Sequence, residues 1–191
     1  MARGTSFLAL LDMLREELGR STNVGVGIDD LPSLKRHINR AYAVLYDDHD
    51  WQHLRYVAPR IALNAGQRYY DFPAALNYER VEQIYIFYGT KTRFLEKGIS
   101  AEEYSLFDST NDARADPAQK WDIQSTTAVP QIEIWPMPVS NTQTLQLIGT
   151  RKIAPLVDDA DLCLLDDELV TLAAAARLLA RQKSDDAKLL L

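Results

Sequence analysis

The 191-residue chain has one cysteine and three histidines, and these shortages exclude several kinds of chemistry. A single cysteine cannot close a disulfide within the chain or supply a multi-cysteine zinc site. Cys163 lies in the apolar run 162–165, so we expect a buried, protonated and unreactive thiol. The sequence also lacks a nucleophile-elbow motif, a dinucleotide-binding glycine fingerprint and a phosphate-binding loop. Because catalytic bases are most often histidines, we expect no enzymatic activity and no cofactor.

Long apolar runs and blocks of basic residues are also missing. No segment approaches the roughly 18 apolar residues that a membrane span requires. The N-terminal apolar stretch is short and carries Asp12 and Arg15, which favours an ordinary helix over a signal peptide. The net charge is −6, from 27 acidic against 21 basic residues, whereas tight non-specific binding of nucleic acid needs several cations converging on phosphates. We therefore expect a protein of the cytosol, or of a particle assembled there, that does not hold nucleic acid tightly.

Three segments have the three- and four-residue apolar spacing of amphipathic helices. The first two span about residues 6–18 and 30–50, and the third begins at three acids that suit a helix N-terminus, residues 166–168. The apolar positions are Phe7, Leu8, Leu11, Leu14 and Leu18; Leu34, Ile38, Ala41, Tyr42 and Leu45; and Leu169, Leu172, Ala173, Ala176, Leu179 and Ala180. Alanines in the last helix allow close approach, so we expect it to pack against the other two.

Between these helices the apolar period changes to the alternation typical of strands. Strands are predicted at residues 56–63, 69–73, 80–88, 91–95, 120–125, 131–135 and 144–153, with a short capped helix at 100–107. The segment 80–88 is partly apolar on both faces, as expected for a central strand. The predicted fold is α+β: a small helical bundle of residues 1–55 and 156–191 with an inserted antiparallel β-rich lobe, residues 56–155.

An acidic cluster closes the second predicted helix. Asp47, Asp48 and Asp50 lie at its C-terminal end, where the helix dipole disfavours negative charge. Nearby His49 and His53 have the four-residue spacing of a helical zinc site, but no glutamate follows His49. We therefore predict no metal site. The alternatives are a solvated polar turn or a contact between subunits.

The C-terminal end of the sequence is unusually apolar. Its last five residues are Ala187, Lys188, Leu189, Leu190 and Leu191. Consecutive leucines at a chain end form an exposed apolar surface unless something covers them. Burial by a partner contributes roughly 1.5 to 3 kcal/mol for each fully buried leucine. We predict that this segment docks into a partner protein.

The order of these elements carries a resemblance that covers nearly the whole chain. Its residues are Trp51-x-x-Leu54 after the second helix, Gly66-x-x-x-Tyr70-x-x-Pro73, Val81-x-x-Ile84, Pro130 before a strand that ends Trp135-Pro136-x-Pro138, and Leu145-x-Leu147-x-Gly149. Followed by a closing Ala/Leu helix, this order resembles the head-to-tail adaptor (connector) proteins of tailed bacteriophages. Each piece alone consists of packing and turn residues and is not specific, so the resemblance rests on the order and spacing of the pieces.

The resemblance implies a structural virion protein at the head-tail junction. Such adaptors form a ring, usually a dodecamer, beneath the portal vertex, where the ring extends the DNA channel and provides the platform for the tail. It further implies that the helical domain builds the ring, that residues 187–191 reach into the portal protein, and that a tail or neck protein binds the far side. Asp47, Asp48 and Asp50 would then lie near the channel or between subunits. An acidic surface suits a channel that DNA crosses without specific binding.

Two other readings remain open at this stage. A head-completion or tail-terminator component of a phage or gene-transfer particle would show the same sequence features but would bind a different neighbouring protein. A cellular binding module or an unrecognised enzyme would instead be a soluble monomer that holds a small ligand in a pocket.

Overall fold

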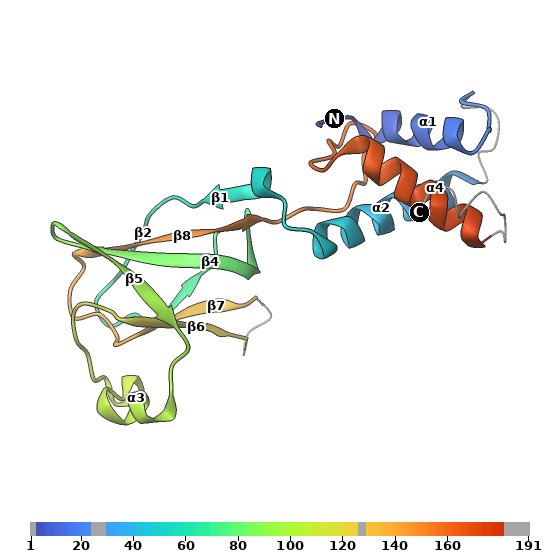
Figure 1. Cartoon of the computed structure of the whole chain (residues 1–191). Coiled ribbons are helices and arrows are strands. Elements are labelled where there is room, and N and C mark those ends of the chain that lie inside the picture. The colour runs from blue at the N-terminus through green and yellow to red at the C-terminus, as the bar shows by residue number, and fades with distance from the viewer. Residues whose placement is uncertain (1–2, 24–29, 126–128, 182–191) are drawn as a thin grey trace. The chain divides into compact units, whose positions relative to one another are not determined.

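The computed structural model describes residues 3–23, 30–125 and 129–181. The chain divides into two compact units, which we call the helical unit (Met1–Gln52 and Ile153–Leu191) and the sheet unit (His53–Lys152) (Figure 1). The helical unit therefore combines both ends of the chain, while the sheet unit is one continuous segment.

Three helices build the helical unit: α1 (Phe7–Glu17), α2 (Leu31–Asp48) and α4 (Asp167–Arg181). Ser6 caps α1 by accepting a hydrogen bond from the Ala9 amide, and the Asp166 carboxylate accepts one from the Leu169 amide at the start of α4. Helix α4 packs against both α1 and α2. The fully buried residues of this core include Phe7, Leu10, Leu14, Leu34, Ile38, Ala41, Val170, Ala174, Ala175 and Ala176. None of the helices in the described ranges has the length and apolarity needed to cross a membrane.

The segment before α4 is tied to the segment before α1 by backbone hydrogen bonds. Cys163 and Thr5 pair through the Cys163 amide and the Thr5 carbonyl at 2.9 Å, and the Phe7 and Leu8 amides donate to the carbonyls of Asp161 and Asp159. These bonds satisfy N–H groups that the first turn of a helix leaves unpaired. Cys163 is buried as expected, and burial raises the pKa of its thiol to about 11.

Eight strands and one helix build the sheet unit. They are β1 (Arg55–Val57), β2 (Ile61–Ala62), β3 (Tyr69–Asp71), β4 (Leu76–Tyr88), β5 (Lys91–Lys97), α3 (Ala101–Leu106), β6 (Lys120–Gln124), β7 (Gln131–Trp135) and β8 (Gln143–Arg151). The strand order is β1-β8-β4-β5-β6-β7-β3, with β2 also paired to β8. The predicted central strand is confirmed, because β4 lies between β8 and β5.

The sheet curls because a short link joins strands near its opposite edges. Strand β2 pairs with β8, β3 pairs with β7, and only residues 63–68 connect β2 to β3. The Tyr70 hydroxyl fixes this link: it accepts a hydrogen bond from the Asn64 amide at 2.9 Å and contacts the carbonyls of Asn64 and Gln67. The curl encloses the second core, which includes Leu63, Ile84, Ile86, Leu95, Trp121, Ile132, Ile134, Leu145 and Leu147.

The predicted fold class is wrong. The largest part of the fold is a curled, mixed sheet of eight strands, accompanied by four helices in the described residues, and not a helical bundle with an inserted antiparallel lobe. The mixed character comes from β5 and β6, which run parallel with Glu96 opposite Lys120. Residues 98–119 contain α3 and return the chain to the other end of the pair, as a parallel connection requires. Alternating apolar residues predict a strand but not the direction of its neighbour.

Candidate protein interaction surfaces

The acidic cluster lies at the end of α2. Asp47 and Asp48 belong to the last turn, Asp50 follows it, and all three are exposed. The turn is held by Trp51, whose indole N–H donates to the Leu45 carbonyl at 2.9 Å. In the described residues, no group of three or more His, Cys, Asp or Glu side chains converges on a metal position. The placement of these carboxylates at a channel or subunit contact stays a prediction.

The predicted portal-docking segment, residues 187–191, lies outside the described residues. The described chain ends with Arg181 in α4.

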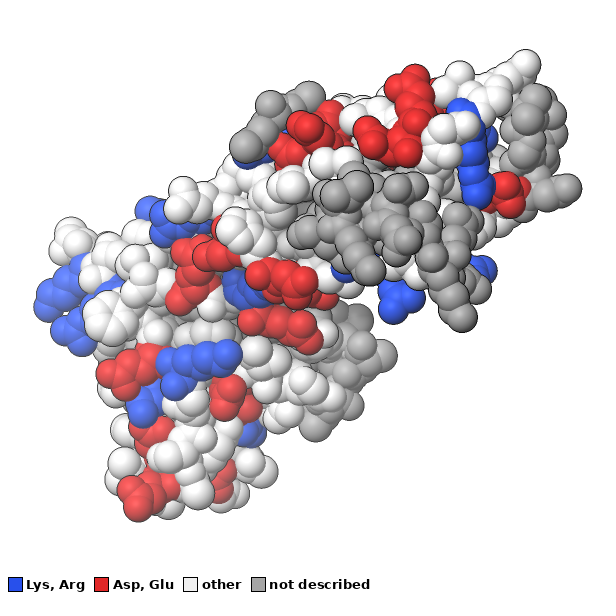
Figure 2. Space-filling model, turned by 45° about the vertical axis from the view of Figure 1, so that its right-hand side comes forward, with Lys and Arg blue, Asp and Glu red and all other residues white. Residues whose placement is uncertain are grey.

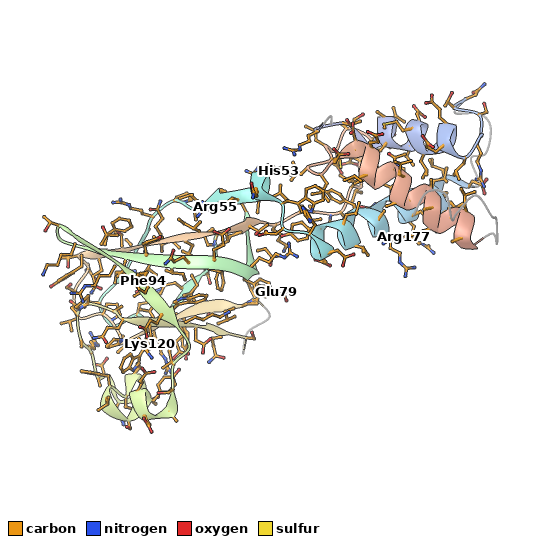
Figure 3. All side chains as sticks on the ribbon, in the orientation of Figure 1. His53, Arg55, Glu79, Phe94, Lys120 and Arg177 are labelled. Carbon is orange, nitrogen blue, oxygen red and sulfur yellow. The ribbon has the colours of Figure 1, made fainter. Side chains whose placement is uncertain are left out.

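A groove between α2 and α4 was missed by the sequence reasoning. It has a volume of about 480 Å³ and is lined by His37, Arg40, Val44, Arg177 and Ala180. The Arg177 guanidinium donates to the Arg40 carbonyl at 3.4 Å, and Figure 3 labels Arg177 on α4. The spacing of His37, Arg40 and Val44 places them along one helix face, which is the signal that could have found the groove. Its guanidinium groups suit a carboxylate or phosphate.

A buried ion pair fixes α3 to the sheet. Glu133 of β7 is only 3% exposed, and its carboxylate accepts hydrogen bonds from Arg68 Nε at 2.7 Å and from the Tyr104 hydroxyl at 2.6 Å. Burial, followed by the hydrogen bond to Glu133, raises the pKa of Tyr104 to about 12. Trp135 adds an indole hydrogen bond to the Phe107 carbonyl at 3.1 Å. These contacts hold the crossover segment in place and offer no nucleophile.

The convex side of the sheet carries an apolar surface, which we call the outer sheet face: Val57, Tyr85, Phe87, Phe94 and Ile148. Inward-pointing Ile84, Ile86, Leu145 and Leu147 alternate with these positions along β4 and β8. Val57 lies opposite Ile148, and Tyr85 lies opposite Phe94. Phe94 is 61% exposed and Val57 53% exposed (Figure 3 labels Phe94). The Arg60 guanidinium lies 3.7 Å from the centre of the Phe87 ring.

The helical unit carries a second exposed apolar surface, which we call the loop face: Leu8, Val157, Asp158, Asp159 and Leu162. Val157 and Leu162 are 69% and 57% exposed, and Leu8 is 44% exposed. The Asp159 carboxylate pairs with Lys35 at 2.8 Å, while Asp158 is exposed. Figure 2 shows acidic side chains gathered over parts of the helical unit. This surface could not be predicted from the sequence, because residues 154–165 have no helical or strand period.

A family model described as SU10 adaptor protein matches residues 5–190, which span both units. No curated protein matches the chain.

Proposed function

Because the chain belongs to the SU10 adaptor protein family, whose members are phage head-to-tail adaptors, we propose that it forms a ring on the portal vertex of the capsid. Membership makes it a structural adaptor of the virion that contacts other head or tail proteins. The ring, the portal as its partner and the channel through it are our proposal. The observation that carries the proposal is that the family match covers both units. A match to the helical unit alone would have left the sheet unit without an assigned role.

The proposed ring extends the DNA channel toward the tail and presents a platform for the next tail or neck protein. The net charge of −6 supports this role, because an acidic protein exerts little attraction on passing phosphates. The exposed carboxylates of Asp47, Asp48 and Asp50 are proposed to face the channel or a neighbouring subunit.

The proposed contact with the portal is made by residues 187–191. Three leucines buried in twelve-fold or similar repetition would give a firm joint, because each fully buried leucine contributes roughly 1.5 to 3 kcal/mol. We also propose that the protein acts structurally and not as an enzyme. The support is chemical: its thiol is buried and protonated, and its histidines lie in no nucleophile motif.

Electron microscopy of purified particles tests the proposal. Particles would carry the intact chain, a chain truncated after Lys183, or a matched control in which Asp185 and Asp186 are replaced by serine. We expect a ring beneath the portal with the intact and control chains, and loss of the ring with the truncated chain.

Three outcomes would contradict the proposal in different ways. A ring that persists after truncation would exclude the leucine segment as the portal contact. Particles of normal architecture that lack the protein would exclude the structural role itself. Density for the chain at the tail end would favour a tail-terminator role instead.

A further inference from the structure

We propose that the outer sheet face of one copy docks on the loop face of the next copy in the ring, an inference that rests on the ring proposed above. The two surfaces belong to different units of the chain, so each copy would offer one surface to one neighbour and the other surface to the other neighbour. The partner is a second copy of this chain.

The outer sheet face has the composition of an interface. An antiparallel sheet that is buried on one face normally carries polar residues on the other. Here four adjacent strands, β1, β8, β4 and β5, contribute apolar or aromatic side chains to the exposed side. None of the described helices packs extensively across these strands. The register also places Gln83 opposite Ile148 and Gln146 opposite Tyr85, so the exposed apolar side chains alternate with amides, a mixture that suits a protein interface.

The loop face is held in a fixed conformation. The Asp161 carboxylate accepts hydrogen bonds from the Val157 and Asp158 amides at 2.6 and 2.8 Å. The carbonyls of Asp161 and Asp159 accept from Phe7 and Leu8 at the start of α1. Its exposed side chains are therefore presented on an ordered backbone, so docking would cost little conformational entropy.

The charges on the two surfaces are complementary. Arg60 lies on the outer sheet face, stacked on Phe87. Asp158 lies among the exposed apolar residues of the loop face, where the neighbouring Asp159 is already paired with Lys35. A two-fold contact of either surface with itself would bring like charges together. A head-to-tail contact instead brings Arg60 to the Asp158 carboxylate, and head-to-tail contacts are the kind that close rings.

Disulfide cross-linking in assembled particles tests this contact. Phe94→Cys and Val157→Cys are placed in the same chain, and Val57→Cys with Val157→Cys samples a second register; all three positions are exposed. The native Cys163 does not interfere, because it is fully buried. After mild oxidation, we expect at least one pair to give a ladder of covalent dimers and larger species on a non-reducing gel. Each single variant should remain monomeric.

Leu106→Cys combined with Val157→Cys is the matched control, because Leu106 is 71% exposed on α3, away from the outer sheet face. A ring seen by microscopy without cross-linking above this control would overturn the contact and leave the proposed function standing. Cross-linking by Phe94→Cys alone would overturn it in favour of a two-fold contact. Absence of any ring in wild-type particles would overturn the proposed function, and this contact with it.

A charge exchange gives an independent test with the same particles. Arg60→Glu or Asp158→Arg alone should each lower the amount of the chain in particles at least several-fold. The double variant should restore most of it if the two side chains meet across the interface. Failure of the double variant to improve on either single variant would count against the contact.

Discussion

At the scale of single residues, Gly149 of β8 has a steric role. It lies opposite Val81 beside an irregularity in the pairing of β4 and β8. A Cβ atom at this position would lie 2.4 Å from the Arg80 carbonyl oxygen and 3.0 Å from the Val81 Cα. Both neighbours are backbone atoms, so they cannot move aside as a flexible side chain would.

Gly149→Ala should therefore lower the free energy of unfolding by about 1–3 kcal/mol, the usual cost of overpacking. Thermal or urea unfolding measures the change. Gly89→Ala is a suitable control, because an added Cβ there meets nothing within 4 Å and only the positive φ of 57° is unfavourable. A smaller loss for Gly149→Ala than for Gly89→Ala would contradict the steric account.

Glu133→Gln tests the buried ion pair. The substitution leaves the Arg68 guanidinium without its charged partner in a site where Glu133 is 3% exposed. We expect a loss of about 2–4 kcal/mol, because breaking a buried pair from one side leaves an uncompensated charge. Glu82→Gln removes the exposed pair with Arg55 and should cost less than about 1 kcal/mol. Equal losses of unfolding free energy for the two variants would show that the buried pair stabilises the protein no more than the exposed pair does.

At the scale of elements, the attachment of α3 should depend on pH. The hydrogen bond from Lys120 and then the Ser100 amide lower the pKa of Glu103 below its ordinary value of 4.5. The contribution of Glu103 is thus complete above about pH 4.5 and is lost as the pH falls through its lower folded-state pKa. The hydrogen-exchange protection factors of residues 100–107, in which the pH dependence of intrinsic exchange is divided out, should fall on acidification from pH 6 to pH 3. In Glu103→Gln this fall should be much smaller; an unchanged fall would assign it to other groups.

Element positions were predictable where a local pattern is sufficient. Apolar spacing located all three long helices, and the capping box at Ser100 located α3, whose amide and carboxylate contacts are present. The predicted strand 56–63 divides into β1 and β2, because Pro59 lies in the middle and cannot donate to a ladder. Pairing partners were not predictable, since they depend on residues far apart in the sequence.

The candidate interaction surfaces were also predictable only where their residues are neighbours in sequence. The acidic turn after α2 is contiguous in sequence, so it was predicted. The outer sheet face takes Val57, Tyr85, Phe94 and Ile148 from four strands, and only the register brings them together. A sequence can show that Phe94 alternates with Leu95, but both are apolar, and nothing local indicates which of them faces the core.

At the scale of the whole molecule, the two units have separate cores and should unfold at different denaturant concentrations. Thiol labelling of the buried Cys163 reports opening of the helical unit, and hydrogen exchange in β4 and β8 reports opening of the sheet unit. Gly149→Ala should shift the second transition and leave the first in place. A single shared shift would show that the units unfold together.

The helical unit is made from the two ends of the chain, and this has a consequence for biosynthesis. While the ribosome is still translating, α1 and α2 emerge without α4, so the buried faces of Phe7, Leu10 and Leu14 lack the cover that α4 provides. The sheet unit, being continuous, has all its strands before α4 is made. A chain whose translation stops before α4 would therefore have a folded sheet unit but an incomplete helical unit. Only finished chains would then present both units to neighbouring head or tail proteins.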